Sequence, residues 1–231
     1  MQKVCGWQDT DKKQTGQFRI ADQRSRRLYK NDSSLTIAAT GGCSRMAEGL
    51  SEVLKKNYME SPVDDNYFRS IVLVTDRDDS GTEHEVIQNI ERVLLRENAV
   101  PQDKVKNNQW SVCEMETQAG DRIRIKLLIL VIPFEEDGAM ETFLLNAIAS
   151  QDAYDKVIND DCKNFVDHTD KSRRYLRGRR LVTKAKFDAY FCVRTAAEQF
   201  HQRRDIIKNI PWEEYAAIQK DFVLLETITD L

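Results

Sequence analysis

The sequence predicts an α/β protein with a mainly parallel central sheet flanked by helices and with a helical C-terminal extension. Residues 71–75 form a continuous β-branched and aliphatic run, which is typical of a strand buried on both faces. Such runs alternate with segments whose apolar residues recur at helical spacing. After Gly138 only the helical spacing remains. Strands that alternate with helices and are followed by helices alone favour this class.

Each element of the prediction has its own pattern. Residues 35–40 form a strand that ends at two glycines, and a helix reaches residue 56. The strand at 71–75 precedes a helix at 82–98. Residues 110–115 and 122–133 predict two more strands, joined by a hairpin turn at 118–121. Further helices follow, including a long one at 184–203 and a last one opened by Pro211. We therefore divide the chain into an α/β domain at 1–150 and a helical extension at 151–231 packed on it.

Composition excludes some classes and leaves the partner open. The 231 residues include 35 Lys and Arg and 38 Asp and Glu, a net charge of −3, so any nucleic-acid argument must rest on local clusters. Hydrophobic residues make up 41%, which is too many for a disordered chain, and the longest apolar run is too short to cross a membrane. Five scattered cysteines and an N-terminus without a signal peptide predict free thiols and a cytoplasmic location.

Two aspartates directly follow the most apolar of the early strands. Asp76 and Asp78 are two residues apart, so in an extended chain they point the same way. Ligands of open α/β sheets bind beyond the carboxyl ends of the strands, and converging carboxylates suit Mg²⁺ or Mn²⁺. The alternative is a polar turn in which Asp79 or Ser80 caps the next helix.

Two other features are candidate parts of a site. Gly41 and Gly42 precede a helix, where backbone N–H groups can approach an anion; the alternative is a tight turn that needs a positive φ. Glu141 follows a buried strand near a helix start and could add a third carboxylate. Its alternative is a solvated acid in the first turn of a helix.

A basic segment is the clearest charge feature. Residues 171–186 hold eight basic residues and no acid, with Tyr175 among them. This pattern predicts contacts with a phosphate backbone of DNA or RNA. The alternative is a solvated loop, or one balanced by Asp160, Asp161 and Asp170. The candidate phosphate-binding residues are Arg173, Arg174, Arg177, Arg179 and Arg180.

Together these residues resemble a Toprim domain, the topoisomerase–primase fold. The similar segments are 35–46, 70–79 and 131–145, and the resemblance covers about residues 34–150. The chain is similar to Toprim-like bacterial proteins of unassigned function and to the Toprim part of overcoming-lysogenization-defect nucleases. The resemblance implies that Asp76 and Asp78 match the family's D-x-D, that Glu141 is similar to its later acidic residue, and that Gly41 and Gly42 match its glycine turn. It also implies Mg²⁺ or Mn²⁺ and phosphodiester chemistry.

One departure from that pattern concerns catalysis. Toprim domains begin with a strand that ends in a glutamate, and residues 1–47 contain no glutamate. The first strand is therefore expected to be missing, which would leave an exposed sheet edge open to pairing with a second copy.

Three functions follow as expectations. The first is a metal-dependent nuclease in which Asp76, Asp78 and Glu141 are catalytic and the first two hold the metal. The second is an inactive nucleic-acid-binding or interaction module, and the third a nucleotide- or phosphate-binding protein.

Overall fold

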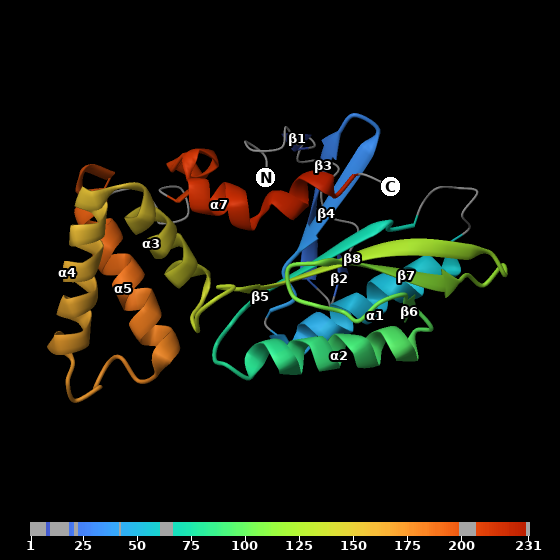
Figure 1. The fold of residues 1–231 in the computed structure, drawn as a ribbon, viewed down its shortest axis with the longest axis horizontal. Helices are drawn as coiled ribbons and strands as arrows, with labels where there is room; N and C mark the ends of the chain where they lie inside the picture. Colours follow the sequence, from blue (N-terminus) through green and yellow to red (C-terminus); the bar gives the residue numbers. More distant parts are fainter. Residues whose placement is uncertain are drawn as a thin grey trace. The chain divides into compact units, whose positions relative to one another are not determined.

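The chain forms two compact units in a computed structural model (Figure 1). The structure describes residues 8–9, 19–20, 23–41, 43–60, 67–198 and 207–229. The first unit runs to Phe134 and includes the C-terminal residues from Leu224, and the second spans Glu135–Val223. In the described part of the chain, no helix has both the length and the apolar character that a membrane span requires.

The main sheet of the first unit has four strands and mixed pairing. Its order is β5 (Ser70–Asp76), β8 (Arg122–Ile132), β7 (Trp110–Glu116) and β6 (Val100–Pro101). Only β5 and β8 pair in parallel; β7 is antiparallel to both of its neighbours. The expectation of a mainly parallel sheet is therefore wrong. The reason is the predicted turn at 118–121, which joins β7 directly to β8 and so reverses the chain.

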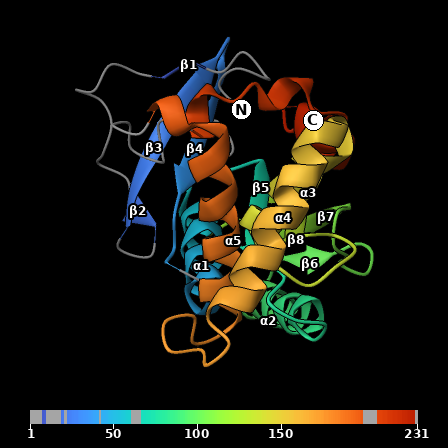
Figure 2. The same ribbon diagram turned by 90° about the vertical axis from the view of Figure 1, so that its left-hand side faces the viewer.

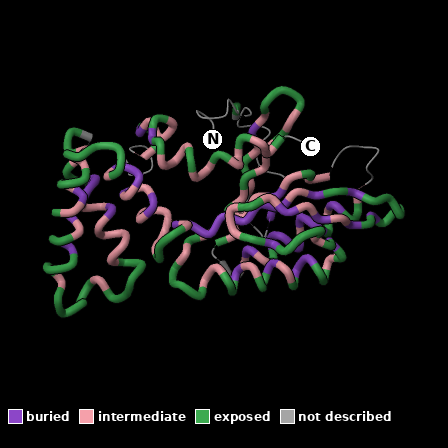
Figure 3. Tube along the Cα trace, viewed as in Figure 1, coloured by how far each residue is buried: buried purple, intermediate pink, exposed green. Residues whose placement is uncertain are grey.

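Two helices cover one face of this sheet. They are α1 (Cys43–Met59) and α2 (Thr82–Arg96), which lie below the sheet in Figure 1. Apolar side chains of both helices pack with alternate residues of β8 in one core. Figure 3 shows the buried residues following β8 along its length. The core members from these three elements are Met46, Leu50, Val53, Leu54, Val86, Ile90, Val93, Leu94, Ile123, Ile125, Leu127, Ile129 and Val131.

The strand expected at 35–40 forms, but in a different sheet. It is β4 (Ser33–Ala38), and it pairs antiparallel with β3 (Gln23–Lys30). The short strands β1 (Gln8–Asp9) and β2 (Arg19–Ile20) also pair with β3. Only two residues separate β3 from β4, and Asn31 there has the φ of 51° that a tight hairpin turn needs. The strand therefore pairs with its neighbour in sequence.

The opposite face of the main sheet meets the end of the chain. Trp110 Nε1 donates to the Leu224 carbonyl at 3.2 Å and to Thr227 Oγ1 at 3.1 Å. Lys126 Nζ donates to the Thr227 carbonyl at 3.2 Å and lies 4.7 Å from the centroid of the Trp110 ring. The residues Leu224 and Thr227 belong to the 3-10 helix η4 (Val223–Thr227), so the chain returns to its first unit after building the second.

The second unit is helical (Figure 2). Its described helices are α3 (Met140–Gln151), α4 (Ala153–Thr169), α5 (Arg179–Arg194) and α7 (Ala216–Asp221). Two 3-10 helices, η2 (Ala196–Glu198) and η3 (Trp212–Glu214), complete it. The helix expected at 184–203 starts earlier, and residues 199–203 lie outside the described residues.

The core of this unit explains where the chain divides. Leu145 and Ile148 of α3 pack with Phe187 and Tyr190 of α5 in a cluster separate from that of the first unit. The compact units therefore part at Phe134, whereas the expected division was at residue 150. The difference arises because α3 buries its apolar face against the later helices.

Candidate functional site

The two expected metal ligands lie at the carboxyl end of the parallel strand pair. Asp76 is the last residue of β5 and is in register with Ile132, the last residue of β8. Asp78 follows two residues later, and both aspartates are exposed. Since side chains alternate along a strand, Asp76 lies on the face of the sheet away from α1 and α2. This is the edge of an α/β sheet at which ligands bind.

Arg77, between the aspartates, belongs to a polar cluster on the helix side. Its guanidinium pairs with the Glu83 carboxylate in the first turn of α2. Glu83 Oε2 also accepts from Asn107 Nδ2 at 3.0 Å. The Arg77 backbone N–H donates to the Ile132 carbonyl at 2.6 Å. Sequence reasoning missed this cluster: Glu83 carried only the signal of a first-turn acid, and Asn107 carried none.

Asp79 has a structural task. Its Oδ1 accepts from the Gly81 N–H at 2.9 Å and from the Thr82 N–H and hydroxyl at 3.0 Å each. The carboxylate thus binds orphan donors at the start of α2, so the capping alternative is confirmed for this residue.

The two aspartates offer the oxygen ligands that a divalent cation prefers. Mg²⁺ prefers carboxylate oxygens and often takes one or two from the protein, with water and substrate oxygens completing the shell. Within the described ranges, no three His, Cys, Asp or Glu side chains are placed to hold a metal together. Glu141 lies in the first turn of α3, in the second unit. Asp76 and Asp78 would therefore supply two ligands.

Where the structure describes the glycine turn, it fits the alternative of a tight turn that needs a positive φ. Gly41 has a φ of +86°, and a Cβ added there would meet nothing within 4 Å. The residue is thus required for backbone conformation rather than for a close approach. Gly42 lies outside the described residues.

The described cysteines are free thiols, and most of them are buried. Cys113 and Cys162 are buried and Cys192 is exposed. Burial raises the pKa of the Cys113 thiol to about 11, so it is protonated at neutral pH and unsuited to nucleophilic attack.

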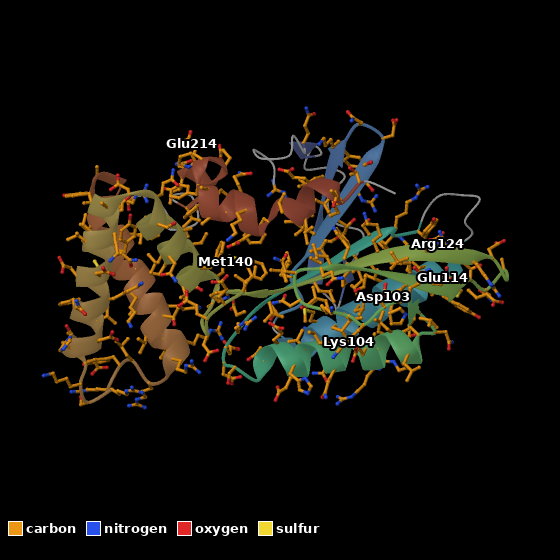
Figure 4. All side chains as sticks on the ribbon, viewed as in Figure 1. Asp103, Lys104, Glu114, Arg124, Met140 and Glu214 are labelled. Carbon is orange, nitrogen blue, oxygen red and sulfur yellow. The ribbon has the colours of Figure 1, made fainter. Side chains whose placement is uncertain are left out.

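The basic residues gather on the connection between α4 and α5 and on the first turn of α5. We call residues 170–180 the basic loop. Figure 4 shows nitrogen-tipped side chains along this connection, at the lower left. The five arginines expected to bind phosphate lie on this one segment, and all of them are exposed: Arg173, Arg174, Arg177, Arg179 and Arg180.

One carboxylate organises the backbone of the basic loop. Asp170 Oδ1 accepts from the Arg174 N–H at 3.0 Å, and Oδ2 accepts from Tyr175 at 2.9 Å and Leu176 at 2.8 Å. The bond from Leu176 is the largest cause that lowers the pKa of Asp170 below its usual 3.8. The acid thus binds backbone donors of the loop.

The other nearby acids leave most of the arginines uncompensated. Asp160 pairs with Lys156 at 2.6 Å, and Arg179 pairs with Asp137 at 3.3 Å. Toward the residues that the structure describes, the other four arginines of the basic loop form no ion pair: Arg173, Arg174, Arg177 and Arg180.

The start of α5 adds to this positive potential. Its first turn contains Arg179 and Arg180 and no acid, and Gly178 before it supplies no side-chain cap. A helix N-terminus already carries a partial positive charge, so cations there are unfavourable unless an anion is bound. The arrangement therefore suits a phosphate-bearing ligand.

Comparison of the chain with protein-family models, with curated proteins and with solved structures finds no match in any of the three. The functional argument accordingly rests on the residues and geometry described above.

Proposed function

We propose that this protein binds nucleic acid through the basic loop. The observation that carries the proposal is the group of four exposed arginines without acidic partners in the described chain, on a loop whose backbone is fixed by Asp170. Arginine binds phosphate oxygens with a planar, permanently charged donor group. A net charge of −3 for the whole chain supplies no general attraction, so affinity would come from this local cluster.

The test is binding of labelled oligonucleotides by fluorescence anisotropy over a range of salt concentrations. A triple variant, Arg173→Gln, Arg174→Gln and Arg177→Gln, is expected to weaken binding at least tenfold. The slope of log affinity against log salt should fall by about 0.7 to 0.9 for each phosphate that the variant no longer binds. The matched control removes three exposed arginines of the first unit: Arg92→Gln, Arg96→Gln and Arg122→Gln.

The control variant should bind as the wild type does. Equal weakening in both triple variants would mean that only the total charge matters and would contradict the proposal. Binding of a mononucleotide without affinity for any oligonucleotide would favour a nucleotide-binding protein instead.

A second function, phosphodiester hydrolysis, is supported by the placement of the aspartates. Asp76 and Asp78 are exposed at the carboxyl end of β5, the edge at which α/β sheets bind ligands. We propose that these two carboxylates hold Mg²⁺ or Mn²⁺. A bound cation of this kind would activate water and polarise a phosphoryl oxygen.

Calorimetric titration with Mn²⁺ tests this second proposal. Wild-type protein should bind the ion, and Asp76→Asn should abolish the heat, whereas Asp103→Asn at another exposed acid should not. No Mn²⁺ binding by the wild type would refute the metal site without affecting the basic loop.

A further inference from the structure

The basic loop carries an exposed aromatic ring at its centre. Tyr175 is 71% exposed, which is unusual for a large side chain with a substantial apolar surface. It is flanked in sequence by Arg174 and lies two residues before Arg177. The Arg174 guanidinium carbon lies 5.4 Å from the centroid of the ring, within cation–π distance. The ring and the charges thus form one surface.

The backbone that carries this ring is fixed on both sides. The N–H groups of Tyr175 and Leu176 both donate to Asp170 Oδ2. On the side of Arg174, the Arg177 Nε donates to the Arg174 carbonyl at 3.0 Å. A ligand would therefore meet a loop whose backbone is already ordered, and binding would lose less conformational entropy than on a free loop.

An aromatic ring beside arginines that have no acidic partner in the described chain suits single-stranded nucleic acid better than a duplex. In a duplex the bases are stacked on one another, so an exposed ring on the protein finds no base face. In a single strand, bases can stack on aromatic side chains while cationic groups follow the phosphates. The phosphate contacts alone would not distinguish the two, since both carry the same charged backbone.

We propose that the basic loop recognises single-stranded nucleic acid by stacking an unpaired base on Tyr175 while Arg173, Arg174 and Arg177 bind the flanking phosphates. This inference rests on the proposed nucleic-acid binding and adds its ligand class. The Arg174 guanidinium lies over one face of the ring, so a base would stack on the other face of this exposed side chain. Tyr175 is the specificity-determining residue, and the arginines supply affinity.

The experiment uses the full chain and two labelled probes, a single strand of about 12 nucleotides, within the usual site size, and the duplex of the same sequence. Wild type should bind the single strand at least tenfold more tightly. Tyr175→Ala should lose that preference, and Tyr175→Phe should keep it. Tyr154→Ala is the matched control because Tyr154 is 76% exposed on α4 of the same unit.

A further variant separates stacking from packing. Tyr175→Leu keeps an apolar side chain without a π-face, so it should lose about tenfold on the single strand and nothing on the duplex. Its salt slope should equal that of the wild type, because no charge is removed. A folding defect would lower affinity for both probes and appear in circular dichroism.

The outcomes distinguish this inference from the function on which it rests. Equal affinity of the wild type for both probes, or an unchanged preference in Tyr175→Ala, would overturn the stacking inference and leave nucleic-acid binding intact. Absence of binding to either probe by the wild type would overturn both.

Discussion

Asp170 shows how a single side chain can shape a binding surface that it does not join. Its two oxygens accept three consecutive backbone N–H groups, from Arg174 to Leu176. A carboxylate that accepts such bonds is favoured in its charged form, so its pKa falls. The charged carboxylate of Asp170 stabilises the folded loop. This contribution is complete above the pKa that Asp170 has in the unfolded chain, and it is lost as the pH falls through the lowered pKa of the folded state.

We predict that Asp170→Ala speeds amide hydrogen exchange at residues 174–176 at neutral pH and has little effect in acid, where the wild-type carboxylate is protonated. In the wild type these amides should stay protected from neutral pH down to about pH 4, near the ordinary aspartate pKa, and lose protection below it. Exchange measured by NMR, corrected for the intrinsic pH dependence, checks both statements. Asp160→Ala is the control, because Asp160 also has a lowered pKa but gains it mainly from the Lys156 side chain. Unchanged exchange in Asp170→Ala would refute the assignment.

At the scale of elements, β8 extends beyond its antiparallel partner. The ladder with β7 ends where Trp110 meets Leu128, four residues before β8 ends. A loop continues the pairing: the Asn108 N–H donates to the Ile129 carbonyl at 2.8 Å. Asn107 Oδ1 accepts from the Val131 N–H at 2.8 Å, and its Nδ2 donates to the Val131 carbonyl at 3.2 Å. One amide thus replaces a missing strand residue.

We predict that Asn107→Ala lowers the free energy of unfolding by about 2 to 4 kcal/mol, because it leaves the buried N–H and carbonyl of Val131 without this partner at about 1 to 3 kcal/mol per group. Urea denaturation measures the change. Asn89→Ala is the control, since Asn89 is an exposed residue of α2 whose amide contacts Arg92. A decrease below about 0.5 kcal/mol, the usual range for surface changes, would show that water replaces the side chain.

The same region shows which elements a sequence can predict. The hydrophobic patterns placed the strands at 71–75, 110–115 and 122–133 and the turn between the last two, because period and turn chemistry are local properties. The partner of residues 35–40 was missed although it is the preceding strand, because the same apolar run fits a parallel sheet or a hairpin. Asn107 could not be found at all, because its role depends on a strand 24 residues away.

The candidate site also has features that the sequence predicts and features that it does not. Runs of like charge are visible in a sequence, so the five arginines were found and lie on one exposed segment. The apolar run at 71–75 predicted where β5 ends, and Asp76 is the last residue of this strand. The cap that Asp79 forms on α2 was one of the alternatives that the sequence offered, whereas nothing in the sequence showed that Asp170 binds the loop backbone instead of the arginines. Both depend on which hydrogen-bond donors the folded chain leaves unpaired.

At the scale of the whole molecule, the described chain has two separate hydrophobic cores. One lies between the main sheet and the helices α1 and α2, and the other among α3, α5 and the segment around Tyr215. The polar network of the second core is also internal to it: Tyr190 donates to Asp155 at 2.8 Å, and Arg194 donates to the hydroxyls of Tyr190 and Tyr215 at 3.0 Å each. The packing of either unit can therefore loosen while the other core stays intact.

This arrangement predicts that core substitutions act within one unit. Ile90, fully buried in the first core, and Phe187, 1% exposed in the second, are the matched pair. Ile90→Ala should cost about 2 to 5 kcal/mol and Phe187→Ala about 3 to 5 kcal/mol. Hydrogen exchange followed by mass spectrometry should then show Ile90→Ala loosening β7 and β8 while α4 and α5 keep their protection, and Phe187→Ala doing the reverse. Equally faster hydrogen exchange throughout the described chain in both variants would mean that the two cores unfold as one cooperative unit.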